Sequence, residues 1–225
     1  LLGLPAGDAR RAAIPLMNPL GDEYALLRTQ MLSGMLTVLA SNYNRKTPGA
    51  RFFEIGRLFR AGALPLAGLP DEAPALSLGL YGDAEDFFTL KGLVEDVLGL
   101  FGIEAAFTRS AEPFLHPGRQ AAVTAAGDPE TVLGVLGEVH PETAERFGME
   151  GVRVYAAQLE LRPLFAVKPE IIRYRPLPRF PAVERDLALV CARELPVAEI
   201  DGAIRQAGGR ILESLTLFDV YEGAQ

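Results

Sequence analysis

Apolar residues recur along this chain at two spacings, and each spacing predicts a different kind of element. Between positions 86 and 101 they lie three or four positions apart, which predicts a helix with one stripe packed on a sheet of its own domain. The stripe contains Phe87, Leu90, Val94, Val97, Leu98 and Phe101. A second helical stretch runs from Leu26 to Asn44, whereas strand-like runs cover 51–60 and 75–81.

Further short strand-like runs follow the helix near position 86 as far as Leu161. Helices and several strands without regular β-α-β spacing favour an α+β domain on a largely antiparallel sheet. We assign this domain to residues 1–167. Four prolines then lie close together, at Pro169, Pro176, Pro178 and Pro181. Because proline favours extended backbone and forbids helix, residues 168–181 are predicted to be a connector to a second domain at 182–225.

The pattern after the connector is typical of a β-α-β unit. Two strand-like runs, RFPAVERDLALV and RILESLTLFDVYEG, flank the helical segment PVAEIDGAIRQAGG. Pro196 suits the first turn of a helix, and the pair Gly208 and Gly209 suits its end, where a positive φ is cheap only for glycine. The residues by themselves therefore predict half of a small α/β sandwich.

Composition and charge narrow the function only slightly. The 225 residues are 49% hydrophobic and carry a formal net charge of −7. Residues 173–225 hold 7 basic and 8 acidic side chains, so this segment shows no electrostatic footprint for nucleic acid. Any contact with RNA must therefore be local, through a few side chains on a sheet or loop.

The sequence predicts a cytoplasmic protein without a membrane partner. No uncharged apolar run reaches the length of about 18 residues that a spanning helix requires. The first residues, LLGLPAGDARRAAIP, lack the ordered regions of a secretion signal. Cys191 is the only cysteine, which excludes an internal disulfide and a thiolate metal cluster.

Few side chains point to metal or anion chemistry. His116 and His140 are each followed by proline and lie far apart, so we interpret both as turn residues at strand ends and predict no metal site. Arg119 follows the turn-like LHPG. An exposed arginine or the partner of a buried carboxylate is favoured there over an anion contact.

Short segments of the sequence are more informative about the family than the composition is. Five segments occur in order: MNPLGDEYALLRTQMLSGMLTVLASNYNRK, RFFEIGRLF, DFFTLKGLVEDVL, LHPGRQAAV and VLGVLGEVHP. Near the end stand FPAVERDLALV and LFDVYEG. From about Met17 to Gln225 these segments resemble the C-terminal part of the beta subunits of bacterial phenylalanyl-tRNA synthetases.

This resemblance implies a class II synthetase-like antiparallel sheet flanked by helices, followed by a truncated ferredoxin-like α/β sandwich. The segment from NPLGDEYALLRT to Asn44 would correspond to the dimer-forming first motif, and FFEIGRLFR to the second. A full β-α-β-β-α-β module needs a second half, so we expect the chain to be a piece of a longer subunit. The family's editing domain lies outside such a piece.

We expect the first domain to be a non-catalytic copy. Amino-acid activation needs arginines that clamp the ATP phosphates and carboxylates that hold Mg²⁺. Glu54 and Arg60 share one strand face, whereas Arg57 points to the other. The third motif is replaced by GVLGEVHPETAERF, where we interpret Glu138 and His140 as structural remnants rather than a catalytic acid and base.

The resemblance assigns anticodon contacts to Ala188, Asp219 and Tyr221. Asp219 and Tyr221 lie two apart on a strand-like run, so a carboxylate would stand beside a stacking ring on one face. Taken alone, the residues also allow Tyr221 to be an ordinary edge aromatic and Asp219 a turn residue. Arg185 and Asp186 are interpreted as a structural pair.

Two classes of function follow. In the first, the chain contributes scaffold and anticodon recognition to a phenylalanine-tRNA ligase. Its partners would be the catalytic alpha subunit, a second beta subunit in an α2β2 assembly, and tRNA(Phe). ATP and Mg²⁺ would bind outside this chain, with no cofactor on it. The alternative is a free-standing regulatory or protein-interaction module. An independent ATP-using enzyme is disfavoured by the missing arginine clamp.

Overall fold

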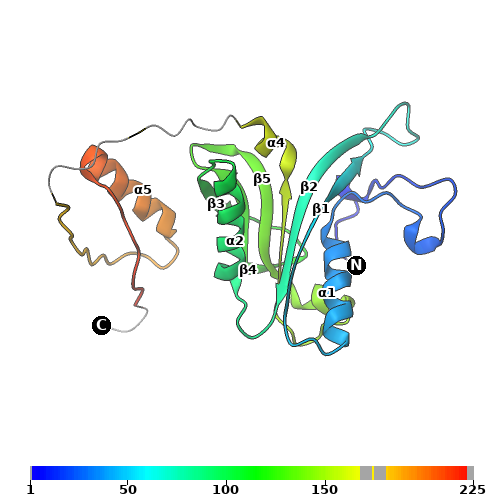
Figure 1. The fold of residues 1–225 in the computed structure, drawn as a ribbon, viewed down its shortest axis with the longest axis horizontal. Helices are drawn as coiled ribbons and strands as arrows, with labels where there is room; N and C mark the ends of the chain where they lie inside the picture. The colour runs from blue at the N-terminus through cyan, green and yellow to red at the C-terminus, as the bar shows by residue number, and fades with distance from the viewer. Residues whose placement is uncertain (1, 168–173, 175–180, 222–225) are drawn as a thin grey trace. The chain divides into compact units, whose positions relative to one another are not determined.

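Six antiparallel strands form the centre of the first part of the chain (Figure 1). The computed structural model describes residues 2–167, 174 and 181–221, and the chain divides into two units, Leu1–Ile172 and Arg173–Gln225. The strands are β1 (Ala50–Arg60), β2 (Asp71–Tyr81), β3 (Ala105–Arg109), β4 (Leu115–Ala125), β5 (Asp128–Val139) and β6 (Val154–Glu160). Their order is β1-β2-β6-β5-β4-β3, so the last strand inserts between β2 and β5. The α+β expectation is confirmed.

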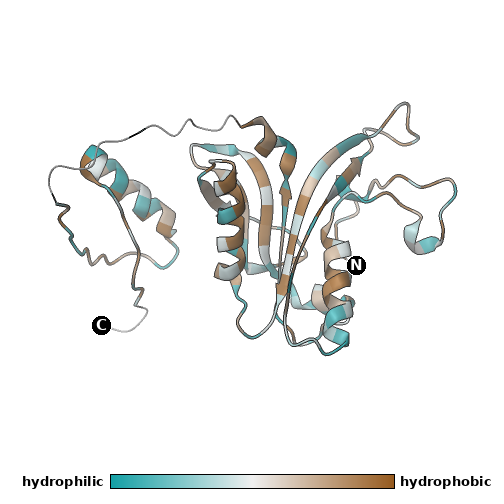
Figure 2. Cartoon of the chain, in the orientation of Figure 1, coloured by the Kyte–Doolittle hydropathy of each residue, from teal (hydrophilic) through white to brown (hydrophobic). Residues whose placement is uncertain are grey.

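Helices cover both faces of this sheet (Figure 1). The long ones are α1 (Leu32–Asn44) and α2 (Phe87–Leu100), and the short ones are α3 (Pro141–Arg146), α4 (Leu161–Ala166) and the 3-10 turns η1 (Ala9–Arg11) and η2 (Asp22–Tyr24). One core joins α2 and α4 to side chains such as Leu78 and Leu159. The other joins α1 to Tyr81 and Ala156 on the opposite face. Figure 2 shows the hydrophobic residues that the strands and helices contribute to these layers.

The predicted helix near position 86 is confirmed as α2. Asp86 caps its N-terminus, because one carboxylate oxygen accepts hydrogen bonds from the Thr89 N–H at 2.6 Å and the Thr89 hydroxyl at 2.8 Å. These hydrogen bonds lower the pKa of Asp86. Leu90, Val94 and Leu98 of the stripe are buried against the sheet. Local periodicity and capping chemistry thus agree with the tertiary packing.

The predicted helix at 26–44 is wrong in its first turns. Helix α1 begins only at Leu32, since the preceding residues pair with another segment. The Leu27 N–H donates to the Ile14 carbonyl at 2.8 Å, and the Met31 N–H donates to Oε1 of Gln158 at 2.7 Å. These contacts hold the chain out of the helical path.

Strand β2 starts four residues earlier than its apolar run, at Asp71 rather than Ala75. The polar start is paired with β1, where Asp71 and Glu72 lie opposite Arg60 and Phe59. Arg60 also contacts Asp71 through an ion pair of 3.9 Å. Cross-strand charge pairs therefore extend the strand beyond its hydrophobic pattern.

The N-terminal segment is tied to the sheet by a small charge network. Arg10 donates to the Asp8 carboxylate at 2.7 Å and to the Glu112 carboxylate at 2.8 Å, and its guanidinium lies 5.5 Å from the centre of the Phe114 ring. The hydrogen bonds from Arg10 lower the pKa of Asp8 to about 2. This network fastens η1 to the loop that precedes β4.

The second unit contains one long element in its described part, helix α5 (Val197–Gly208), followed by the 3-10 turn η3 (Gly209–Ile211). The helix ends as predicted, because Gly209 takes a φ of +51°. The two predicted flanking strands are wrong for this structure: 181–192 and 212–221 contain no strand. In a split β-α-β arrangement another strand lies between these two, and no described residue supplies it. Most of the predicted connector, 168–173 and 175–180, lies outside the described residues.

Arg28 reaches across the outer edge of β1 over Gly56. Its Nε donates to the Arg57 carbonyl at 2.9 Å, and its Nη1 donates to Oε1 of Glu54 at 2.5 Å. A Cβ atom on residue 56 would overlap the Arg28 guanidinium and approach the Met31 methyl group at 3.2 Å. Glycine leaves room for the Arg28 guanidinium here, and a larger residue would be accommodated by a shift of this flexible side-chain end.

We expect Gly134→Ala on β5 to lower the free energy of unfolding by about 1–3 kcal/mol, because its Cβ would lie 2.2 Å from the Gln158 carbonyl oxygen and 2.9 Å from the Leu159 Cα, both in the main chain of β6. Urea unfolding of the purified chain measures the effect. Gly92→Ala is the matched control: its Cβ would meet no atom within 4 Å, and it lies inside α2, where alanine is the better helix former. Equal destabilisation by the two variants would contradict the close approach of β5 and β6 at Gly134.

Candidate functional site

The most deeply buried carboxylate of the first unit belongs to Glu138, near the end of β5. Arg119 on β4 forms a two-pronged ion pair with it: Nε lies 2.6 Å from Oε2, and Nη2 lies 2.9 Å from Oε1. Tyr155 lies directly opposite Glu138 on β6. Its pKa is raised by burial and by the charge of Glu138, while the hydrogen bond to Glu138 raises the pKa of Arg119.

This arrangement supports the structural interpretation of Glu138 and Arg119. Both carboxylate oxygens are engaged by one guanidinium, so neither is held ready to accept a proton from a substrate. His140 has a different structural role. It caps the N-terminus of α3, where its Nδ1 accepts a hydrogen bond from the Glu142 N–H at 3.3 Å. Glu138 and His140 therefore serve two separate elements.

His116 lies in β4, where its Nδ1 accepts a hydrogen bond from the Gly118 N–H at 3.1 Å. Among the described residues, no three potential ligands from histidine, cysteine, aspartate and glutamate gather as a metal site would require. Across the same described ranges, no helix has the length and apolar character that a membrane span needs.

The charged residues of β1 that could resemble a phosphate clamp are used inside the chain. Arg57 lies 3.6 Å from Glu72, and Arg60 forms an ion pair with Glu160 on β6. Glu54 is bonded to Arg28. The neighbouring carboxylates offset the positive charge of both arginines, which weakens the case for nucleotide binding on this face.

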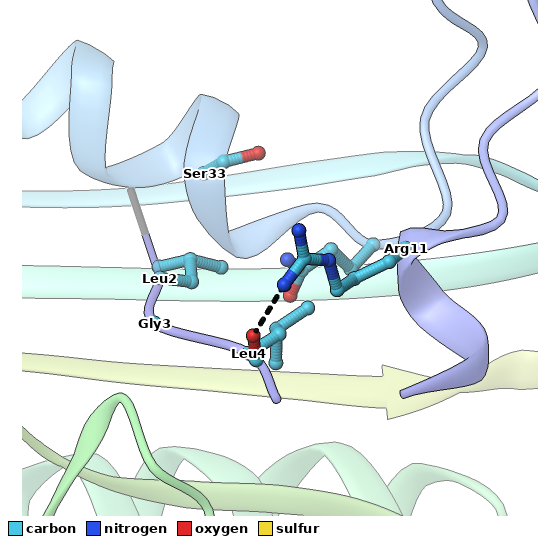
Figure 3. Close-up of a pocket in the computed structure, with 6 residues that line it drawn as sticks. Leu2, Gly3, Leu4, Arg11 and Ser33 are labelled. Carbon is cyan, nitrogen blue, oxygen red and sulfur yellow. Dashed lines mark hydrogen bonds between the residues drawn. The ribbon is translucent and has the colours of Figure 1, made fainter. Parts of the chain in front are cut away.

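Among the cavities that open on the first unit are two with charged lining residues. The smaller, of about 390 Å³, is lined by Leu2, Gly3, Leu4, Arg11, Gln30 and Ser33. Figure 3 shows Arg11 reaching toward Leu4, whose carbonyl accepts a hydrogen bond from the guanidinium at 3.1 Å. This hydrogen bond occupies one N–H donor of the Arg11 guanidinium within the chain.

The larger cavity, of about 590 Å³, has charged residues of both signs in its lining: Lys46, Asp83, Glu85 and Arg153. Glu85 is already bonded to Arg51 at 2.8 Å. The mixed charge favours no single class of ligand.

The segment 16–26, which we call the apolar loop, exposes its hydrophobic side chains. Met17 is 95% exposed and Leu20 is 99% exposed, and the exposed apolar set also includes Leu16, Tyr24 and Leu26. The base of the loop is closed, since the Leu16 N–H donates to the Ala25 carbonyl at 2.8 Å. A closed loop that presents several large apolar side chains to solvent is typical of a protein-protein contact.

The three residues predicted to meet anticodon bases lie in the second unit. Ala188, Asp219 and Tyr221 are all exposed, with Tyr221 at 79%. Ala188 lies in the extended segment before α5, and the other two lie in the segment after it. The described residues 181–221 form no strand, so no strand pairing aligns Ala188 with Asp219 or Tyr221.

Comparison with known proteins identifies the family. A profile for the phenylalanyl-tRNA synthetase beta chain CLM domain matches residues 2–161. The chain belongs to this family. A profile for the ferredoxin-fold anticodon binding domain matches residues 178–225.

Phenylalanine–tRNA ligase beta subunits from several bacteria align with almost the whole chain. Identity is 42% for the protein of Symbiobacterium thermophilum, 37% for that of Clostridium acetobutylicum and 36% for that of Moorella thermoacetica, each over 99% of this chain. The aligned part is 26% of the first relative and 28% of the other two. This beta-chain family member therefore spans about a quarter of the length of its curated relatives.

Sequence reasoning anticipated some features of this CLM-family domain and missed others. Arg119 as the partner of a buried carboxylate is confirmed, with Glu138 as that carboxylate. The exposure of the apolar loop was not anticipated, although the run of large apolar residues around Met17 and Leu20 could have indicated it. Spacing in sequence carries no signal for which side of a loop faces solvent.

We expect Arg119→Ala to lower the free energy of unfolding by about 1–3 kcal/mol, because Glu138 stays buried without its partner. Urea unfolding at neutral pH measures the loss. Arg162→Ala is the control, since Arg162 and Asp71 form an ion pair of 2.8 Å in which both side chains are about half exposed. That pair is worth about 0–1 kcal/mol. If both variants lose the same stability, the buried pair has no special weight.

Proposed function

We propose that this chain is part of the beta subunit of a phenylalanine–tRNA ligase, where it supports the catalytic alpha subunit and contacts the tRNA anticodon. The observation that carries the proposal is the order of the two family matches, CLM at 2–161 and anticodon binding at 178–225. Similarity to ligase beta subunits over 99% of the chain supports the same conclusion. The assembly would charge tRNA(Phe) with phenylalanine at the expense of ATP.

The first domain, which we place at 1–167, is proposed to be a non-catalytic class II synthetase-like core. A six-stranded antiparallel sheet with helices on both faces supports this assignment. So does the internal pairing of Arg57 with Glu72 and of Arg60 with Glu160, which leaves these arginines engaged. ATP and Mg²⁺ would accordingly bind on the alpha subunit, and no residue of this chain would be catalytic.

The apolar loop is proposed to contact the alpha subunit. Met17 and Leu20 expose nearly their whole side chains, and burying each against a partner would contribute about 1.5–3 kcal/mol before the entropic cost of association. A second beta subunit would complete an α2β2 assembly in the cytoplasm.

The second domain, at 182–225 beyond a connector at 168–181, is proposed to bind the anticodon through Ala188, Asp219 and Tyr221. Exposure of all three side chains supports this role. A tyrosine ring provides a stacking surface for an unpaired base, and a carboxylate accepts hydrogen bonds from base edges. The net acidity of residues 173–225 requires that recognition rest on such local contacts.

Co-expression with the alpha subunit of the same source tests the assembly. We expect the two chains to co-elute in size-exclusion chromatography at moderate salt, and Leu20→Asp to abolish co-elution because a charge cannot be buried without a partner. Leu69→Asp is the matched control, since Leu69 is also 99% exposed but lies outside the apolar loop. Separate elution of the wild-type chains would favour a free-standing module.

Anticodon contact is tested in the ligase assembled with a full-length beta subunit. We expect Tyr221→Ala to weaken tRNA binding by about 1–3 kcal/mol through lost stacking, and Tyr221→Phe to retain most of it. Asp219→Asn, which keeps shape but removes charge, is expected to raise the KM for tRNA. Unchanged aminoacylation by both Tyr221→Ala and Asp219→Ala would show that the assigned positions are wrong.

A further inference from the structure

Strand β1 is an outer strand of the described sheet, where β2 is its only strand neighbour. It pairs with β2 over 11 residues with no bulge or register shift. Its sequence, ARFFEIGRLFR, contains neither lysine nor proline. Native proteins commonly protect exposed edges with such residues or with bulges, because an open edge is a template for another strand. The outer edge of β1 therefore lacks these protections.

Two hydrogen bonds show which main-chain groups of β1 face outward. The Phe59 N–H donates to the Arg28 carbonyl at 2.9 Å, and the Arg57 carbonyl accepts from the Arg28 side chain at 2.9 Å. In an antiparallel strand, the N–H and C=O of one residue point to the same side, and successive residues alternate. The outward residues nearer the start of the strand are therefore Ile55, Phe53 and Arg51.

These last three residues form the open stretch of the edge. Among the described residues, no hydrogen bond reaches the outward N–H or C=O group of any of them. The bonds from Arg28 close the edge at 57–59, and the strand begins at Ala50. The open stretch therefore runs from 51 to 55, and Phe53 lies at its centre.

The side chains of this edge end two apolar rows of the sheet. Phe53 lies opposite Leu78, and Ile55 lies opposite Leu76, both of which belong to the core beneath α2. Yet Phe53 is 72% exposed and Ile55 is 65% exposed. A strand added beside β1 would extend both rows and cover these side chains.

A second copy of β1 matches the open stretch when a two-fold axis passes between Phe53 and the partner's Phe53. Outward residues then face outward residues, since Arg51 lies opposite the partner's Ile55 on either side of the axis. Each such pair exchanges two main-chain hydrogen bonds, so every outward N–H and C=O group of the stretch is satisfied. No other two-fold register uses the whole of the open stretch.

This register also brings no like charges directly opposite each other. Arg51 faces an apolar side chain, and Glu54 faces the partner's Phe52. Glu54 forms an ion pair with Arg28 of its own chain, so its charge is balanced beside the axis. Phe53 packs against the partner's Phe53, and aromatic pairs across antiparallel strands are stabilising.

The bonds that Arg28 makes to β1 favour the same register. With Phe53 at the axis, Arg57 falls opposite a position that precedes the start of β1 in the partner, so the Arg28 bonds remain intact. Moving the axis by one residue would place Arg51 opposite the partner's Arg57 and Glu54 opposite the partner's Glu54. Like charges directly opposite are destabilising, and the Arg57 carbonyl would also have to leave Arg28.

We propose that this chain associates with a second copy of itself by antiparallel pairing of the two β1 edges about Phe53, which joins the two sheets into one. The edge itself identifies the occupant, because its open length, its hydrogen-bond pattern and its charges are all complementary to an inverted copy. The inference goes beyond the proposed function, since the pairing requires no alpha subunit and no RNA. A pairing this short buries less surface than a standard interface, so a weak, concentration-dependent dimer is expected.

Sedimentation of the purified chain from micromolar to millimolar concentration tests the association. Reducing conditions are required, because the exposed Cys191 can otherwise cross-link two copies. We expect the apparent mass to rise from one chain toward two. Phe53→Lys is expected to raise the Kd of self-association at least about tenfold, since like charges would lie opposite each other at the axis. Phe88→Lys on α2 is the matched control, because Phe88 is 74% exposed but lies outside the edge.

Opposite charges at the axis give a sharper test of the register. Phe53→Lys and Phe53→Glu are each expected to remain monomeric alone, whereas an equimolar mixture of the two is expected to associate. This recovery requires that position 53 meets position 53 of the partner, because opposite charges stabilise a pair only where they lie directly across the strands.

Amide hydrogen exchange locates the contact on the chain. The amides of Arg51, Phe53 and Ile55 are expected to exchange at least about tenfold more slowly where the chain is dimeric than where it is monomeric, since each gains an acceptor in the partner. The amides of β3, at the opposite edge of the sheet, are the internal control and are expected not to change.

Each outcome bears on the pairing alone. A wild-type chain that stays monomeric throughout, wild-type association of Phe53→Lys, equal loss of association by Phe88→Lys, or a charge-swapped mixture that fails to associate would overturn the inference. Ile55→Pro removes one outward N–H without removing a hydrogen bond to β2, and it carries the test if thermal unfolding shows that Phe53→Lys does not fold. Co-elution with the alpha subunit is a separate measurement, so the proposed function stands or falls independently.

Discussion

Burial of the central strands on both faces is the constraint on which the first unit depends. From Ala75 to Tyr81 every residue of β2 is buried, and β6 is nearly as enclosed beside it. A strand that is apolar on both sides needs two layers, so one core forms under α2 and another under α1. Even the polar Gln158 of β6 is used in this way, because it accepts a hydrogen bond from the main chain that starts α1. The helices and the N-terminal segment are arranged around these central strands.

The charges on the sheet serve the fold. Arg119 neutralises the buried Glu138, and Arg57 and Arg60 of β1 form ion pairs with Glu72 on β2 and Glu160 on β6. A carboxylate beside a guanidinium offsets its positive charge, so these arginines attract a phosphate less than unpaired arginines would. The surfaces left for recognition are therefore mainly apolar or made of main-chain groups. The apolar loop is of this kind.

The second unit differs from the first in the burial of its side chains. None of its described residues is buried, and the apolar residues Ile200 and Ile204 of the amphipathic helix α5 are only partly covered. A helix of 12 residues gains little from hydrogen bonding alone and relies on packing of its apolar side. The strand-like runs around it have the composition of strands but no neighbour to pair with. Anticodon recognition by Asp219 and Tyr221 would accordingly require the sheet that aligns them.

The sequence by itself determined the elements whose signal is local. It also determined the family, because the segments that resemble the family occur in the same order along the chain. Helix α2 was predicted from its apolar stripe, and α5 from Pro196 and its terminal glycines. The α+β class followed from the order of helices and strands. Periodicity reports which face of an element is apolar, and this information survives without knowledge of any partner.

Only the tertiary structure decided which segments meet. The insertion of β6 between β2 and β5, the pairing of Arg119 with Glu138, and the late start of α1 each depend on residues far apart in sequence. The same dependence explains the absent strands of the second unit, because a strand exists only where a neighbour accepts its hydrogen bonds. Strand pairing and charge pairing are non-local, so spacing along the chain does not encode them.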